Sequence, residues 1–313
     1  MKVSKGKAEH KRLIKERWFD AGTRAFERVF PCVRAKDFPD IENPYICPLC
    51  RGAFPRSAII DKALTFEDAP PKSYGGHRVA LTCQRCNNSL GSSLDASLSV
   101  LDGSPLSPCK ISIGGVEVNA YEEILPHGRN FQVPEIQNNP AKQERFFEIL
   151  EGTTAESSLT YKADSEKRRR ADLAWLKAAY MVAFAAWGYF YSFSAALDIV
   201  RRQLLHHEHE IIPHFKVINR EMPRSNRFLI YVRKPQEFNA VAVGMGQYIV
   251  FLPADARDMT LYSRIEPILA GNNRITLSGD TYFWPKEPTH SLDVVSFESP
   301  LVLPTPADVH LLT

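Results

Sequence analysis

The chain has 313 residues, 44% of them hydrophobic, and a formal net charge of +3 at pH 7. A chain of this length and apolar content can bury a sizeable core, and it is more typical of two domains than of one. No apolar signal-peptide core follows Met1, and most of the cysteines fall in closely spaced pairs. We therefore expect a reducing, cytoplasmic setting rather than a secreted protein.

The first expected element is a helix over residues 8–29, because apolar side chains recur there at helical spacing and Phe30-Pro31 ends the pattern. Lysine and arginine outnumber aspartate and glutamate over residues 1–36. Such a basic arm suits contact with phosphate groups, and a solvated basic helix face is an equally common explanation.

Two Cys-x-x-Cys pairs, Cys47/Cys50 and Cys83/Cys86, lie a few tens of residues apart. Each pair can place two thiolates on one knuckle, and two knuckles complete a tetrahedron around one ion. This spacing predicts a structural zinc site in which these four cysteines are the ligands.

The segment between the two pairs predicts a hairpin, followed by a helix after the second pair. Residues 57–66 are apolar enough for a strand that leads into Glu67, and residues 78–82 form the returning strand. Paired prolines and paired glycines mark the loop between these strands. The helix is expected at residues 92–98.

At these residues the chain resembles the HNH endonucleases, the zinc-ribbon branch of the ββα-metal nucleases. Their pattern is an acidic residue plus histidine, often followed by a proline, then a loop with glycine, and then Leu-x-Cys-x-x-Cys-Asn. The matching residues here are Glu67-Asp68, Pro70, Gly75-Gly76 and the run from Leu81 to Asn87. A hairpin followed by a helix is the order that the ββα-metal architecture requires.

The resemblance implies metal-dependent hydrolysis of phosphodiester bonds in DNA, with RNA as a further candidate substrate. By position, Glu67 is a ligand of a catalytic Mg²⁺ or Mn²⁺ ion, Asp68 takes the place of the general base, and Asn87 is the ligand on the helix. The family usually has histidine at the base position, and a carboxylate is a weaker base at neutral pH. A carboxylate is a good ligand for a hard cation, so Asp68 is also expected to hold the ion.

Further residues of the motif are assigned to substrate contact. His77-Arg78 replaces the middle asparagine of the family pattern, which makes His77 an alternative base and Arg78 a phosphate contact. Lys72 and Arg85 are the other expected contacts to nucleic acid. Asn88 adjoins Asn87 and could substitute for it as a ligand.

Two alternatives stay open for this stretch. Without the flanking motif, Glu67-Asp68 would be a loop carboxylate pair before a turn, and Asn87 and Asn88 would cap the helix. The protein could also be a catalytically inactive module that binds nucleic acid or a protein partner on the same zinc scaffold. The missing histidine at the base position favours this second function.

Glycine, serine and proline become frequent around residues 101–108, which indicates the exit from the first domain. We therefore expect an N-terminal helix and zinc-bound nuclease module at residues 1–105, and an α+β accessory or target-recognition domain at residues 106–313. The elements expected in the second domain are strands within residues 110–125, a helix at 138–150, a polar linker at 152–158, a helix from 166 to about 205 with a break near Gly188, and short strands at 228–232, 240–243, 248–252, 274–277 and 294–297.

The long helix is expected to be the central element of that domain, because residues 175–184 are apolar nearly all round. Residues 178–197 contain no charged side chain and are long enough to span a membrane. Alanine, serine, glycine, tyrosine and tryptophan dominate there in place of leucine, isoleucine and valine, so we expect a helix buried in protein and no membrane insertion. Its aromatic residues could stack on bases, but at helical spacing they are more typical of a core.

The histidines of residues 206–214 could bind a metal, but they lack an evident closed geometry and more often mark the solvated end of a helix. Cys32 and Cys109 are expected to be ordinary free thiols.

The sequence thus predicts an α+β protein, with an N-terminal ββα-metal (HNH-like) zinc-knuckle module and a C-terminal α+β domain that contains a long buried helix and antiparallel strands. The expected function is that of a DNA endonuclease with structural Zn²⁺ and catalytic Mg²⁺ or Mn²⁺. The C-terminal domain is expected to select the target, or to bind a protein partner or a second copy of the chain. Phage defence, mobile elements and restriction are all settings of this family, and the sequence does not choose among them.

Overall fold

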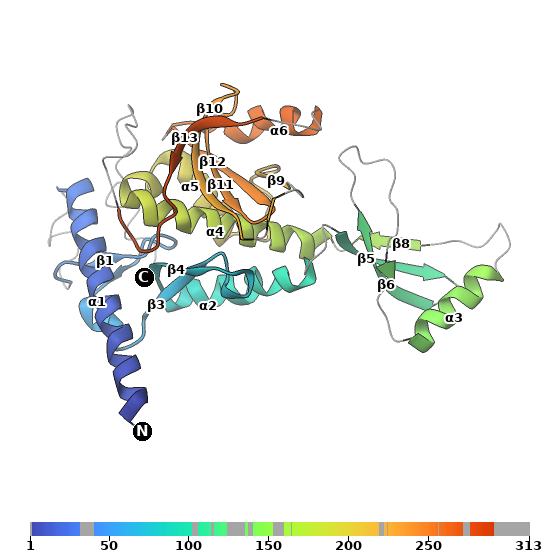
Figure 1. Ribbon diagram of the computed structural model, residues 1–313, viewed down its shortest axis with the longest axis horizontal. Helices are drawn as coiled ribbons and strands as arrows, with labels where there is room; N and C mark the ends of the chain where they lie inside the picture. Colours follow the sequence, from blue (N-terminus) through green and yellow to red (C-terminus); the bar gives the residue numbers. More distant parts are fainter. Residues whose placement is uncertain are drawn as a thin grey trace. The chain divides into compact units, whose positions relative to one another are not determined.

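The computed structural model describes residues 2–31, 41–101, 106–113, 116–123, 135–136, 140–152, 160–163, 165–218, 222–223, 225–255, 257–271 and 276–290 (Figure 1). The chain divides into two compact units. The first joins the N-terminal residues up to Gly91 to the residues from Trp175 onward, and the second is Ser92–Ala174. The expected boundary at residue 105 does not coincide with this division, because the cysteine module and the C-terminal half share one core.

The N-terminal part of the first unit is a helix followed by short strands and a hairpin. The helix α1 begins earlier than expected, at Lys2, and ends at Val29 as its apolar pattern predicts. Its buried face carries Trp18, Phe19 and Phe26. The elements that follow are β1 (Tyr45–Ile46), β2 (Ala53–Phe54), the 3₁₀ turn η1 (Arg56–Ile59), β3 (Leu64–Ala69), the 3₁₀ turn η2 (Lys72–Tyr74), β4 (His77–Cys83) and α2 (Gln84–Ser93).

Two expected boundaries in this part are corrected. Residues 57–66 are not one strand, because Pro55 starts a 3₁₀ turn and β3 begins only at Leu64. The helix expected at residues 92–98 begins at Gln84, directly after Cys83, and a 3₁₀ segment, η3 (Asp95–Leu101), occupies most of the expected range. The second cysteine pair therefore lies at the junction of β4 and α2.

The helix α4 (Ser165–Ser192) passes through the core of the first unit from Trp175 onward. Every residue from 175 to 189 is buried, which confirms the expected internal helix. The expected break is also confirmed, because Gly188 has φ 67° and ψ −151°, a backbone conformation that essentially only glycine adopts. The chain then continues as α5 (Ala195–Leu205), where the Leu197 N–H donates to the hydroxyl of the N-cap residue Ser194.

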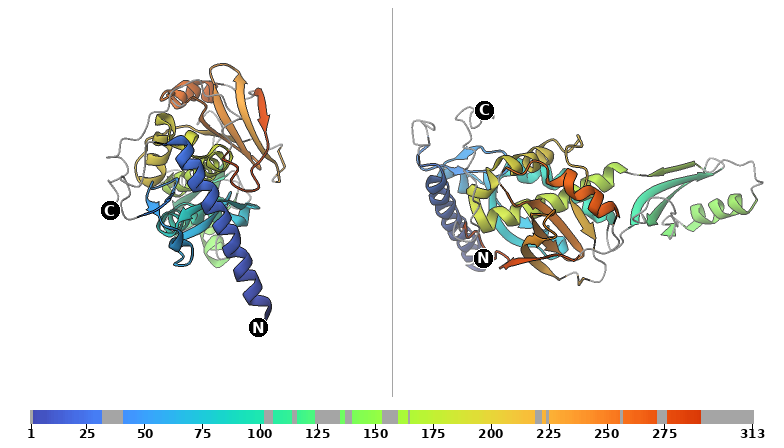
Figure 2. Two further views of the ribbon diagram at one scale, coloured as in Figure 1. Left: turned by 90° about the vertical axis from the view of Figure 1, so that its left-hand side faces the viewer. Right: turned by 90° about the horizontal axis from the view of Figure 1, so that it is seen from above.

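A five-stranded antiparallel sheet packs against α4. Its strand order is β13-β10-β11-β12-β9, and the central strand β11 is buried along its whole length. The Trp175 ring stacks on Tyr248 of β12 with ring centres 4.3 Å apart, and the Tyr191 hydroxyl donates to the Pro253 carbonyl over 2.7 Å. Figures 1 and 2 show α4 beside these strands. The members of the sheet and the helix that follows β12 are β9 (Lys216–Ile218), β10 (Arg227–Lys234), β11 (Ala240–Met245), β12 (Tyr248–Pro253), β13 (Ser278–Tyr282) and α6 (Leu261–Gly271).

The strand pattern of the C-terminal half is confirmed in part. Three expected strands correspond to β10, β11 and β12. The strand expected at 274–277 lies further on, at β13, and the strand expected at 294–297 falls outside the described residues. Mixed helices and antiparallel sheets place the chain in the α+β class.

The second unit contains a four-stranded antiparallel sheet of order β7-β6-β5-β8 and the helix α3. The two long strands pair over their whole length, as the alternating pattern around the paired glycines predicts. The elements are β5 (Leu106–Ile113), β6 (Val116–Glu123), β7 (Glu135–Ile136), α3 (Pro140–Glu151) and β8 (Thr160–Ala163). Across the described residues, no helix combines the length and the hydropathy that a membrane span needs.

Candidate functional site

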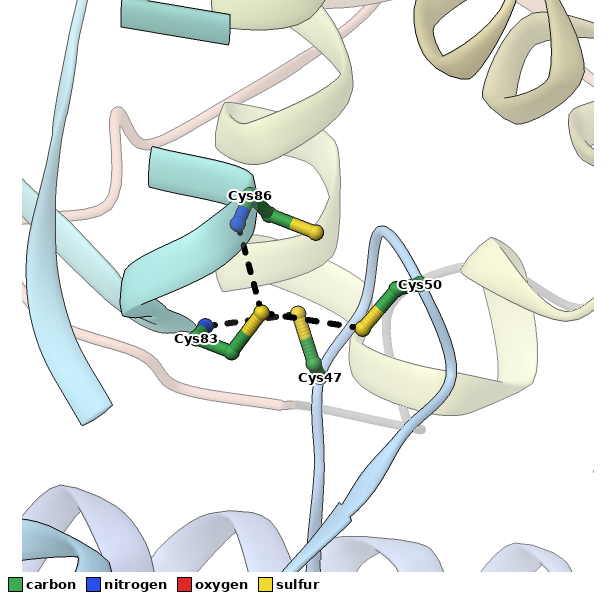
Figure 3. Close-up of side chains that lie close together, drawn as sticks. All are labelled: Cys47, Cys50, Cys83 and Cys86. Atoms are coloured by element: carbon green, nitrogen blue, oxygen red, sulfur yellow. Dashed lines mark hydrogen bonds between the residues drawn. The ribbon is translucent and has the colours of Figure 1, made fainter. Parts of the chain in front are cut away.

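Four cysteines from two distant segments converge on one point (Figure 3). The ligand atoms of Cys47, Cys50, Cys83 and Cys86 all lie within 4.8 Å of one another. The Cys50 and Cys83 sulfur atoms are 3.7 Å apart. A tetrahedral ion with metal–sulfur bonds of about 2.3 Å places its sulfurs about 3.8 Å apart, whereas a disulfide would need about 2 Å. The spacing therefore fits a shared metal ion such as zinc, and it does not fit a disulfide.

Tight backbone turns hold both pairs. The Cys47 N–H donates to the Gly52 carbonyl and the Arg51 N–H donates to the Cys47 carbonyl, each over 2.9 Å, so the first knuckle closes on itself. Arg51 has φ 61°, the left-handed conformation that such a turn requires. The second knuckle forms where β4 passes into α2, and there the Cys86 N–H points at the Cys83 sulfur over 3.4 Å.

Amide donors favour the charged form of the cluster, whereas burial opposes it unless a cation is bound. The Gly52 N–H donates to the Cys50 sulfur and the Cys83 N–H to the Cys47 sulfur, each over 3.4 Å. Burial raises the pKa of the Cys47 thiol, whereas hydrogen bonds from the neighbouring thiols, that of Cys47 first, lower the pKa of Cys50. Four thiolates at this distance repel one another, so a cation between them is needed to hold all four in the ionised form.

The hairpin β3–β4 carries most of the other expected site residues. Its register pairs Glu67 with Ala80 and Asp68 with Arg78, with a β-bulge between the two pairs. Successive residues of a strand point to opposite faces, so Glu67 and Asp68 face opposite ways. The sequence had led us to expect that they share one ion, and this arrangement does not place them to do so.

The Glu67 carboxylate is buried and bound by side chains of the core. Its Oε1 lies 2.8 Å from Nζ of Lys177 on α4, and the side chains of both residues are at most 3% exposed. Its Oε2 accepts a hydrogen bond from the Thr82 hydroxyl over 3.2 Å. The ammonium group therefore lies at the carboxylate that the resemblance assigned to a catalytic metal ion.

The opposite face of the hairpin is basic. The Arg78 guanidinium lies 4.4 Å from the centre of the Phe66 ring, and the Lys15 ammonium of α1 lies 5.5 Å from the same ring. Asp68 is half-buried on this face. Its carboxylate has no hydrogen-bond or ion-pair partner within the described part of the chain, unlike that of Glu67.

His77 and Asn87 are held by backbone carbonyl groups. His77 Nε2 lies 3.1 Å from the Pro285 carbonyl oxygen, which can only accept, so Nε2 carries the proton and the neutral ring presents Nδ1 as an acceptor. The Asn87 amide nitrogen donates to the Thr65 hydroxyl over 2.8 Å and to the Phe66 carbonyl over 2.9 Å, which ties α2 to β3. His77 is paired with Ala69, so it lies on the Glu67 face and not beside Asp68.

Lys72, Arg85 and Asn88 are exposed, the first in the hairpin loop and the other two on α2. In the hairpin loop, an added Cβ at Gly76 would lie 1.5 Å from the Pro70 carbonyl oxygen, so only glycine fits this close approach. The paired glycines of the motif therefore have a structural reason.

The histidines near the end of α5 do not form a closed metal site. Nitrogen atoms of His206, His207 and His209 lie 3.7 Å from the Glu208 carboxylate, and most of these side chains are exposed. Among the described residues, the four cysteines are the only set of three or more Cys, His, Asp or Glu side chains close enough to hold one ion.

Sequence reasoning missed the residues of α4 that support the site. Besides the Lys177 contact, the Tyr180 hydroxyl donates to the Pro48 carbonyl over 2.9 Å and the Tyr189 hydroxyl to the Ile46 carbonyl over 2.6 Å. These bonds fix the backbone that carries Cys47. The available signal was a single lysine within residues 173–197, which are otherwise uncharged, since a lysine there needs a buried acidic partner.

No family model, curated protein or solved structure matches the chain.

Proposed function

We propose that the protein is an HNH-type endonuclease that hydrolyses phosphodiester bonds in DNA and holds Zn²⁺ in its cysteine cluster. The supporting observation is the hairpin β3–β4 running directly into α2, with Cys83 and Cys86 at the junction and the Cys47/Cys50 knuckle completing the cluster. Strand, strand, knuckle and helix then follow in the order of a ββα-metal module.

The residues fit a catalytic Mg²⁺ or Mn²⁺ ion poorly. Lys177 neutralises Glu67, and Glu67 and Asp68 lie on opposite faces of β3. A divalent ion prefers several oxygen ligands that converge on one point. We therefore assign the chemistry to groups of the chain.

Asp68 is our candidate for the group that accepts a proton from the attacking water. It is half-buried and faces Arg78 across the hairpin, and a guanidinium is suited to neutralise a phosphate oxygen as charge develops on it. His77 is the alternative base, because its Nε2–H is committed to the Pro285 carbonyl and Nδ1 can accept a proton. Asp68 and His77 lie on different faces of the hairpin, so single substitutions can distinguish which of them accepts the proton.

Nicking of supercoiled plasmid DNA by the purified full chain, with added Mg²⁺ or Mn²⁺, tests this proposal. We expect wild type to nick and Asp68→Ala to lose at least about 100-fold in rate, the usual contribution of a general base. Asp61→Ala is the matched control, because Asp61 is an exposed carboxylate just before β3. Loss of activity in His77→Gln with full activity in Asp68→Ala would assign the base to His77. Absence of cleavage by wild type in either metal would refute the endonuclease.

The second candidate is a nucleic-acid-binding protein that uses the same metal-stabilised scaffold without cleavage. The buried Glu67–Lys177 pair favours it, because a carboxylate held by an ammonium is not available to a metal ion. This candidate predicts salt-dependent binding to DNA with no cleavage in any divalent metal. Nicking by wild type that disappears in Asp68→Ala would exclude it.

A further inference from the structure

We infer that the Phe66 face of the hairpin and the adjoining side of α1 form a binding surface for the phosphodiester backbone of a nucleic acid. This inference rests on the proposed function and specifies where its substrate lies. We call the surface the cation surface and define it by the basic residues Lys7, Lys11, Lys15, Lys62 and Arg78.

The centre of the cation surface is built and not merely exposed. The Phe66 ring packs edge-on against Trp18, with ring centres 5.2 Å apart, and carries the Arg78 guanidinium 4.4 Å from its centre. The Lys15 ammonium approaches the same ring and donates to the Leu64 carbonyl over 2.6 Å. Two cations from different elements are thus fixed around one aromatic side chain.

These cations repel one another and lack acidic partners. The pKa of Lys15 is lowered by burial and then by the charges of Arg78 and Lys62, so the three side chains lie close enough to interact. Within the described residues, none of the three forms an ion pair. A cluster of like charges costs free energy in the unbound protein, and a bound anion recovers that free energy.

Three neighbouring arginines behave differently, which makes the missing partners informative. Each of them is paired with an acid, and these pairs are Arg12 with Glu16, Arg17 with Glu287 and Arg56 with Asp20. Acids are therefore present in this region, but they are directed to other cations. The unpaired set coincides with the face that carries Asp68.

The helix α1 extends the surface along one direction. Lys7, Lys11 and Lys15 recur every four residues, so they lie on one side of the helix about 6 Å apart along its axis. Lys7 and Lys11 are exposed and form no ion pair within the described part of the chain. In Figure 2 the first turns of α1 project beyond the elements that pack against the rest of this helix. A row of cations fits a polyanionic chain better than a single small anion.

The cation surface recognises the negative charge of the backbone and not the identity of the bases. Its aromatic side chain, Phe66, is covered by Lys15, Arg78 and Trp18, so its ring is not open for stacking on a base. Backbone contacts of this kind are independent of sequence and strongly dependent on salt. Asp68 lies on the same face, so a phosphate held by Arg78 is presented to the carboxylate of the proposed chemistry.

Fluorescence anisotropy of the metal-loaded full chain, with a labelled DNA duplex, a single-stranded DNA and an RNA duplex, and without added Mg²⁺ or Mn²⁺, tests the inference. We expect Arg78→Ala and Lys15→Met each to weaken binding about fivefold at 0.15 M salt, and each to reduce the slope of log K against log salt by about 1. Arg56→Ala is the matched control, because its guanidinium is paired with Asp20, and it should bind as wild type does. Arg78→Lys, which keeps the charge, should retain most of the affinity, and a thermal melt of each variant checks folding.

Every outcome bears on the proposal. Variants that bind all three nucleic acids with wild-type affinity and salt slope overturn the cation surface, whether or not wild type cleaves DNA. Weaker binding by the variants without cleavage by wild type supports the surface and removes the endonuclease. Absence of binding by wild type to any of the three overturns both. The nucleic acid whose binding is weakened most by the substitutions is the one that the cation surface binds.

Discussion

Substitution of Lys177 by methionine removes the buried cation beside Glu67 and leaves the length of the side chain nearly unchanged. The Glu67 carboxylate then stays buried without its ammonium partner and still accepts from the Thr82 hydroxyl, at a position where its side chain is 3% exposed. Removal of one member of a buried ion pair costs about 3–5 kcal/mol, because the other charge is left uncompensated. At about 2 °C per kcal/mol for a protein of this size, the melting temperature should fall by about 6–10 °C.

Calorimetry and urea unfolding of the metal-loaded protein measure this loss. The control is the double variant Glu67→Leu with Lys177→Met, which removes both charges together. It should be within about 1 kcal/mol of wild type or more stable, because an apolar pair of similar volume avoids the desolvation cost. A single variant as stable as wild type, or a double variant less stable than Lys177→Met, would refute the electrostatic account of this pair.

The remaining predictions concern the metal and the pH dependence. Cys83→Ser should release the bound metal, as measured by elemental analysis. The melting temperature should also fall, because the metal-binding free energy of such a cluster is also folding free energy. Retention of one tightly bound ion would contradict the four-cysteine site. Burial lowers the pKa of His290 from 6.5 to about 4. As the pH falls from 6.5 to 4, the imidazole is therefore protonated in the unfolded chain but not in the folded one, which lowers the stability of the fold. Between pH 7 and pH 4, wild type should therefore lose about 3 kcal/mol more stability than His290→Asn, a residue that does not titrate and tolerates the positive φ at this position. Parallel losses in urea unfolding would show that His290 does not titrate in this range.

The metal cluster and the hairpin could be predicted because their determinants are local. The spacing within each cysteine pair fixes a knuckle, and the apolar run before Cys83 fixes a strand. The break in the long helix was equally local, since a lone glycine in an apolar helix marks the one place where a positive φ is cheap. Each of these features is determined by residues that are close together in the sequence.

The arrangement of the candidate site could not be predicted in full, because its determinants come from distant elements. Glu67 was assigned to a metal ion because the motif alone was considered, and Lys177 lies on a helix more than a hundred residues later. The opposite orientations of Glu67 and Asp68 could have been foreseen, since the residue pair was expected to follow a strand. The start of α2 was missed because its polar run of asparagine and serine has little helical signal, and the cysteine knuckle overrides that weak preference.

The hydrogen bonds from Tyr180 and Tyr189 to the backbone of the first knuckle determine when the metal site becomes complete during synthesis. A ribosome delivers the cysteines well before it delivers α4, so the early chain has its thiolates but lacks the hydroxyl donors and the counter-ion of Glu67. We expect the growing chain to hold its metal weakly and to gain full affinity only when α4 has emerged. Tight metal retention would then report that synthesis has passed the central helix.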